Sequence, residues 1–91
     1  MADYTLRIQK ARGSDEFFEM DLKEVDEQIF MAAYAYIRKE KELEAVKVII
    51  ANCWVSGEPK ETILNNFQYL RAATRPITEF LAPLEGELKK N

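Results

Sequence analysis

The chain has 91 residues, which is enough for one domain, residues 1–91, and too few for separate catalytic and binding domains. Its 16 acidic and 13 basic residues give a net charge of −3, which argues against nucleic acid as a partner. There is no histidine, and the single cysteine, Cys53, has no partner for an intramolecular disulfide.

The sequence also gives little support for catalysis or for cofactor binding. Without histidine, a thiolate nucleophile or a zinc site lacks its usual partner. The three glycines form no phosphate-binding loop, and no apolar run is long enough to span a membrane. The first ten residues lack the order of a signal peptide. We therefore expect a cytoplasmic protein that is not an enzyme, with no catalytic residue, cofactor or metal ion and no membrane partner.

Alternating apolar residues predict a β-hairpin over residues 1–20. Apolar side chains recur at every second position on both sides of the polar segment 11–16: Tyr4, Leu6 and Ile8 before it, and Phe18 and Met20 after it. A lone hairpin is marginal in water, so its apolar face must lie on the helices or its edge must pair with another copy of the chain. The sequence leaves both arrangements open.

A first helix is expected to begin at Asp21. Asp21 and Glu24 have the spacing of a capping box, in which each side chain accepts a hydrogen bond from the other residue's backbone amide. The acidic residues that follow are typical of a first helical turn, because they complement the helix dipole. We prefer this explanation of the acidic cluster to a metal site.

Aromatic residues occur on more than one face of this helix. Its apolar stripe, at steps of three and four, consists of Val25, Ile29, Ala32, Ala33, Tyr36 and Ile37. Phe30, Met31 and Tyr34 lie off that stripe. Such a helix either packs against two other elements of the same chain or has an exposed patch that contacts another protein. Of the two, the sequence favours the core explanation.

A second helical stripe follows the charged segment 38–42, which is either a helix extension or a short break. It consists of Leu43, Val46, Ile49, Ile50 and Cys53, and the cysteine is expected to be a small core residue. Asn52 either bonds a neighbouring backbone group or makes a buried polar contact with a partner. Gly57 is expected to supply a left-handed helix cap, and Pro59 to open the next helix.

Two further helices are predicted in the C-terminal third. The third has an apolar set of Ile63, Leu64, Phe67 and Leu70, with Asn65 and Asn66 in an unfavourable position at its middle. Thr74–Pro76 is expected to stop it and start a fourth helix, in which Pro83 causes a kink or a break near Ala82. The predicted class is α+β, mostly α: an N-terminal β-hairpin followed by three to four short helices packed as a compact bundle over residues 21–90.

One segment of the second helix resembles a known family. The string AVKVIIANCWVSGE, residues 45–58, is similar to a helix-to-loop stretch of small phage and prophage proteins, namely tail assembly chaperones and their uncharacterised relatives. Asn52, Cys53, Trp54 and Gly57 carry this resemblance. It implies a bacterial host cell as the location and no catalytic role for these four residues.

By this resemblance the chain would be a non-enzymatic, protein-binding assembly factor that holds a long helical protein of the tape-measure type. A small acidic protein with spare aromatic residues can hold an amphipathic helix in a groove, and the candidate anchors are Phe30, Met31, Tyr34 and Trp54. The alternative is a self-associating structural or accessory protein encoded by a prophage, in which the same aromatic residues and the hairpin edge join copies into a homo-oligomer.

Overall fold

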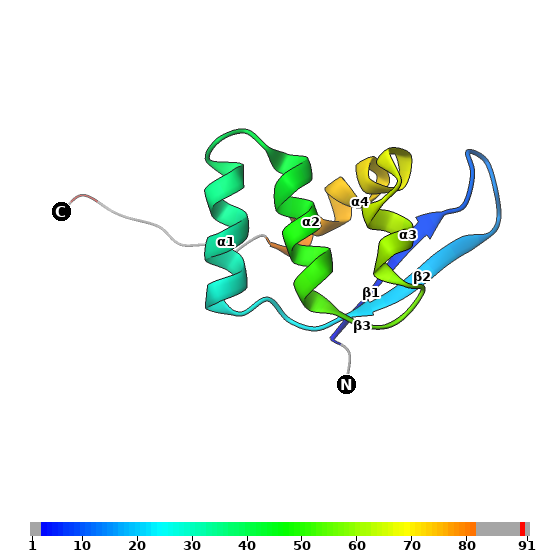
Figure 1. Cartoon of the computed structure of the whole chain (residues 1–91), viewed down its shortest axis with the longest axis horizontal. Helices are drawn as coiled ribbons and strands as arrows, with labels where there is room; N and C mark the ends of the chain where they lie inside the picture. Colours follow the sequence, from blue (N-terminus) through cyan, green and yellow to red (C-terminus); the bar gives the residue numbers. More distant parts are fainter. Residues whose placement is uncertain (1–2, 82–89, 91) are drawn as a thin grey trace.

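The computed structural model describes residues 3–81 and residue 90, and it confirms an α+β fold that begins with a β-hairpin and continues with helices (Figure 1). The expected division at residue 20 was close, because the hairpin extends two residues further. In chain order the elements are β1 (Tyr4–Gln9), β2 (Phe17–Leu22), α1 (Glu27–Ile37), α2 (Glu42–Cys53), β3 (Trp54–Gly57), α3 (Lys60–Leu64) and α4 (Phe67–Phe80).

The sheet has three antiparallel strands in the order β1-β2-β3. β1 pairs with β2 in a regular register from Tyr4 opposite Leu22 to Gln9 opposite Phe17. β3, which the sequence did not predict, pairs with the other edge of β2 through an irregular register at Asp21 and Leu22. The strand follows the last residue of α2 directly, so its pattern is hidden in one apolar run; it forms because β2 offers an edge to bind.

The two faces of the sheet differ in polarity. Four alternating residues of the hairpin are buried against the helices: Leu6, Ile8, Met20 and Leu22. Thr5 and Ser56 on the other face donate hydroxyl hydrogen bonds to the Asp21 carboxylate, at 2.9 and 3.1 Å. The predicted alternation is therefore correct for Leu6, Ile8 and Met20, whereas Phe18 is half-buried and Tyr4, at an open end of the sheet, is exposed.

The expected helix start at Asp21 is wrong. Asp21 and Leu22 belong to β2, and α1 begins at Glu27. The cap is Asp26, whose side chain accepts a hydrogen bond from the amide of Ile29 at 2.8 Å. Pairing with β1 and β3 satisfies the backbone of residues 21 and 22, so the strand prevails over the local capping pattern.

α2 supplies the centre of the core. Ala45, Val46, Ile49, Ile50 and Cys53 are buried, as the second stripe predicted for the last four. The segment between α1 and α2 is a break, in which Glu40 adopts a left-handed φ of 59°. Asn52 is exposed and donates from Nδ2 to the Val48 carbonyl at 2.8 Å, which confirms the local backbone bond.

Gly57 does not cap a helix. α2 already ends at Cys53, and Gly57 lies at the end of β3 with φ 97°. A Cβ at this position would stand 2.7 Å from the carbonyl oxygen of Glu19. The left-handed backbone was predicted correctly, but it serves the close approach of β3 to β2.

The break in the C-terminal helices lies at Asn65–Asn66 and not at Thr74–Pro76. Asn66 caps α4, because its side chain accepts from the amides of Gln68 and Tyr69 at 2.9 and 3.2 Å. α4 then continues through Pro76 to Phe80 and buries Leu70, Ala73 and Ile77. The kink expected near Pro83 falls outside the described residues.

Candidate protein-binding surface

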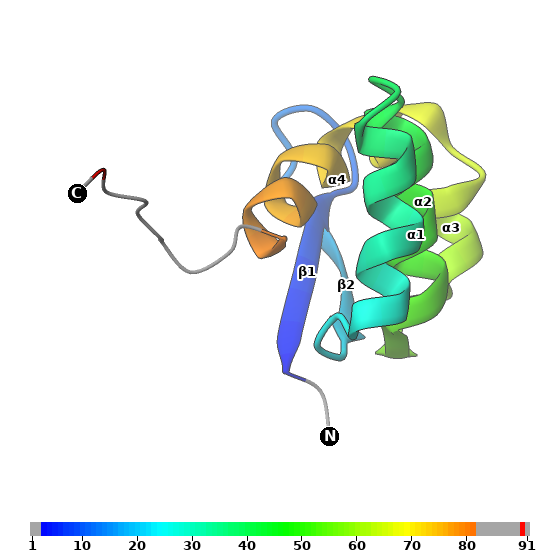
Figure 2. The ribbon, with the colours of Figure 1, turned by 90° about the vertical axis from the view of Figure 1, so that its left-hand side faces the viewer.

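α1 lies at one side of the fold and packs mainly against α2 (Figures 1 and 2). Ala33 is its one buried residue, with Ile29 half-buried beside it. From residue 28 to residue 37 the helix carries no charged side chain. An exposed helix normally shows charged groups to water, so this stretch is unusual for a surface that meets only solvent.

Three large side chains form a continuous exposed surface on α1. Phe30 is 40% exposed, Met31 62% and Tyr34 46%. The rings of Phe30 and Tyr34, one helical turn apart, are stacked with centroids 5.6 Å apart and planes 15° apart. The expectation that these residues fill a core is therefore wrong. We call Phe30, Met31 and Tyr34 the α1 stripe.

The sequence missed two members of this exposed surface. Tyr36 and Ile37 belonged to the predicted core stripe, and more than a third of each is exposed. A helix with one main helical neighbour can bury only a narrow face, so residues at the margins of the predicted stripe remain in solvent. The absence of charge from residues 28–37 was the signal that could have indicated this.

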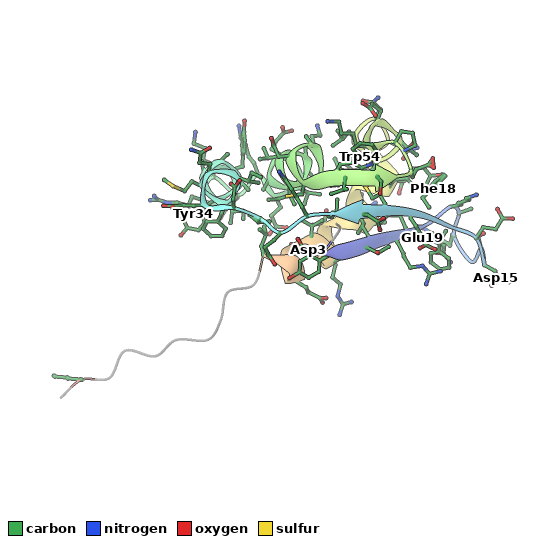
Figure 3. The ribbon with its side chains drawn as sticks, turned by 90° about the horizontal axis from the view of Figure 1, so that it is seen from below. Asp3, Asp15, Phe18, Glu19, Tyr34 and Trp54 are labelled. Carbon is green, nitrogen blue, oxygen red and sulfur yellow. The ribbon has the colours of Figure 1, made fainter. Side chains whose placement is uncertain are left out.

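Trp54 does not join the α1 stripe. It is the first residue of β3, half-buried against the core, and its indole Nε1 donates to the Glu58 carbonyl at 2.8 Å. Figure 3 shows Tyr34 on α1 and Trp54 on β3 at separate places in the fold. Because its polar atom is satisfied and its ring packs on the core, Trp54 stabilises the turn from α2 into the sheet.

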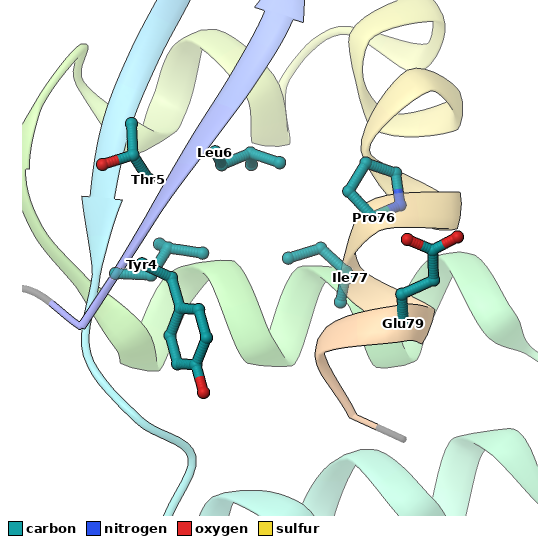
Figure 4. A pocket seen from close by; sticks show the side chains of 7 residues that line it. Tyr4, Thr5, Leu6, Pro76, Ile77 and Glu79 are labelled. Atoms are coloured by element: carbon teal, nitrogen blue, oxygen red, sulfur yellow. The ribbon is translucent and has the colours of Figure 1, made fainter.

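A second feature is an apolar groove between β1 and α4, with a volume of about 270 Å³. Its lining is formed by residues of both elements and one of β2: Tyr4, Thr5, Leu6, Leu22, Pro76, Ile77 and Glu79 (Figure 4). β1 is an outer strand of the sheet, so the groove lies along the sheet's edge.

Nucleophilic and metal-binding groups are not assembled in the described part of the chain. Cys53 is fully buried, and burial raises the pKa of its thiol above the usual value. The Tyr4 hydroxyl donates to Glu24 at 2.9 Å, and this bond raises the pKa of the tyrosine. Residues 3–81 bring together no group of three metal-ligating side chains.

Among the described helices, none is long and apolar enough to cross a membrane. Comparisons of the chain with protein-family models, with curated proteins and with solved structures found no match.

Proposed function

We propose that this protein is a non-enzymatic assembly factor that binds a helical partner protein through the α1 stripe. The observation that carries the proposal is the exposed, uncharged surface of α1. A large exposed apolar patch on a protein usually marks a site where another protein binds. By the resemblance of residues 45–58, the partner is a long tape-measure-type protein, and the setting is the cytoplasm of a phage-infected or prophage-bearing cell.

The spacing of the stripe fits a helix as the partner. Phe30 and Tyr34 are four residues apart and Ile37 follows three residues later, so their side chains form a ridge along the axis of α1. Ten uncharged residues extend for about 15 Å along a helix, which is roughly three turns of a partner. The apolar face of an amphipathic helix can pack against this ridge and cover both rings.

Charges at the two ends of the stripe favour one orientation of the partner. Asp26 and Glu27 precede it, and Arg38 and Lys39 follow it. A partner helix with basic residues near Glu27 and acidic residues near Arg38 matches both ends. These exposed charges influence specificity and association rate more than affinity.

The experiment is affinity capture with the tagged chain from cells of its source after prophage induction, with co-purifying proteins identified by mass spectrometry. We expect enrichment of one long, helix-rich protein. Phe30→Asp and Tyr34→Asp should each abolish this enrichment, because an aspartate at the centre of an apolar contact remains unpaired after burial.

Phe67→Asp is the matched control. Phe67 is 59% exposed on α4, so it receives the same substitution at a comparable ring outside the stripe, and capture should persist. Recovery of only untagged copies of the chain would contradict the proposal. Loss of capture by the Phe67 variant as well would show that the effect is not specific to α1.

Self-association is the second candidate function, and a different surface favours it. The edge of the sheet at β1 has no neighbouring strand among the described residues. An open edge is a natural site for pairing with another chain.

A further inference from the structure

The exposed face of α1 has the spacing of a helix–helix contact. Glu27, Met31, Tyr34 and Arg38 follow one another at intervals of four, three and four residues, and all four are exposed. Arg38 is the C-cap and keeps helical backbone angles, so it continues this line of side chains. The same intervals separate the contact positions of two helices that pack along each other. Ala33, the buried residue of α1, lies on another side of the helix, so this face is free to bind a second helix.

The two charged positions of this face are available for a contact. The ion pairs among the described residues join other side chains, and neither Glu27 nor Arg38 takes part in any of them. Asp26 differs, because its carboxylate accepts from the Ile29 amide and caps the helix. The face therefore ends in one free acidic group and one free basic group, with only uncharged residues between them.

We propose that α1 of a second copy of the chain packs antiparallel on this face, about a two-fold axis between residues 32 and 33. In this register Met31 lies beside Tyr34 of the second copy, and Glu27 lies beside its Arg38. The axis repeats both contacts, so two ion pairs flank two methionine–tyrosine contacts. Methionine sulfur packs favourably against aromatic rings. Phe30, which is stacked on Tyr34 of its own chain, extends the apolar contact on one side.

Charge excludes the other arrangements of two identical helices. A parallel pair brings Glu27 to Glu27 and Arg38 to Arg38, and both contacts are repulsive. An antiparallel pair shifted by one heptad brings Glu27 to Met31 or Arg38 to Tyr34, so a charge is covered without a partner. Only the register centred between residues 32 and 33 joins the acidic and the basic end of the face twice.

The proposed dimer goes beyond the binding of a helical partner, although it uses the same surface. Figure 2 shows α1 in front of α2, on the outer side of the fold. Because α1 is already folded against α2, pairing requires no new helix. The 11 residues of α1 give a small contact, so we expect a dissociation constant in roughly the micromolar range or above. A weak dimer shields the α1 stripe from water and gives way to a partner helix that binds more tightly.

Charge exchange tests the ion pairs. Glu27→Lys and Arg38→Glu each bring like charges together twice in a homodimer, so each should raise the dissociation constant roughly tenfold or more. In an equimolar mixture of the two variants, both end pairs of a heterodimer are again of opposite charge. Sedimentation equilibrium should therefore show a dimer in the mixture at concentrations where each variant alone is monomeric. Arg71→Glu, the same change at an exposed arginine of α4, is the matched control and should leave the dimer unchanged.

Engineered cysteines test the register. Chains with Met31→Cys, mixed with chains with Tyr34→Cys, bring two thiols together, so mild oxidation should give a covalent dimer that a reductant separates. Ala32→Cys is the control, because Ala32 is exposed but turned by about 100° from Met31 around the helix. Its mixture with Tyr34→Cys should cross-link much less. The native Cys53 is buried in all these chains. Far-UV circular dichroism confirms that each variant is folded, and the cross-links decide the question if a charge variant is not.

The outcomes separate this dimer from the proposed function. A wild-type mass of one chain at all concentrations up to the millimolar range would overturn the dimer, whether or not a helical protein is captured. A dimer that tolerates both charge variants, or that cross-links equally through Ala32→Cys, would assign the contact to another surface, such as the edge at β1, and would also overturn it. Dimerisation that follows the charge exchange would support it, even if affinity capture finds no long helical protein and so contradicts the proposed function alone.

Discussion

The Cys53 thiol links burial in the core to the stability of the protein at alkaline pH. Below about pH 9, the usual thiol pKa, both folded and unfolded chains keep the proton. Above it the unfolded chain ionises first, because burial keeps the folded-state pKa higher. The free energy of unfolding should therefore fall as the pH rises through this window. Denaturant unfolding at several pH values measures this decrease in the free energy of unfolding. Cys53→Ala should make the decrease smaller. An equal decrease in the variant would mean that other groups cause it.

Asn66 is expected to stabilise the start of α4. Its side chain accepts from two backbone amides that the helix itself cannot satisfy. Asn66→Ala should lower the free energy of unfolding by about 1 kcal/mol. Asn65→Ala is the control, because no cap of α4 depends on it, and it should change stability by less than about 0.5 kcal/mol. Similar losses for both variants in urea unfolding would contradict this role.

Gly57 should tolerate substitution less well than Gly13. Both residues have positive φ, so an alanine costs about 1–2 kcal/mol at either position through the backbone alone. A Cβ at Gly57 would also stand 2.7 Å from the Glu19 carbonyl oxygen, whereas a Cβ at Gly13 would meet no described heavy atom within 4 Å beyond its two chain neighbours. Thermal unfolding should show a larger loss of stability for Gly57→Ala than for Gly13→Ala. Equal losses would mean that β2 and β3 move apart at little cost to make room for the added methyl group.

At the scale of the element, the inner and outer faces of α1 should respond differently to the same substitution. Tyr34→Asp removes an exposed ring and its stack with Phe30, so it should cost about 1 kcal/mol and leave the protein folded. Ala33→Asp places a carboxylate in the core and should cost about 4 kcal/mol or more. Circular dichroism with urea unfolding compares them. If the Tyr34 variant unfolds, the side chains of the α1 stripe belong to the core, and the proposed binding site is wrong.

The boundaries of the elements show where local patterns failed. Asp21 and Glu24 resemble a helix cap, but strand pairing places Asp21 in β2. Thr74–Pro76 resembles a helix stop, but α4 continues through it and buries Ile77. In both cases contacts distant in sequence, which no local window contains, outweigh the local preference.

At the scale of the whole molecule, dimerisation through α1 should make thermal stability depend on concentration. Binding that favours the folded state raises the unfolding midpoint as protein concentration increases. We expect this rise for the wild type. Scanning calorimetry over a series of concentrations measures it. A midpoint independent of concentration for the wild type would contradict the dimer.

The sequence by itself determined the α+β class, the hairpin and the buried positions of α2, because each follows from the period of apolar residues within one segment. It also supplied Phe30, Met31 and Tyr34 as candidates, since they lie off the predicted stripe. Only the tertiary structure decided that these residues are exposed, that Trp54 is separate from them and that β3 completes the sheet. Exposure and strand pairing depend on which element lies beside which, and that neighbour is distant in the sequence.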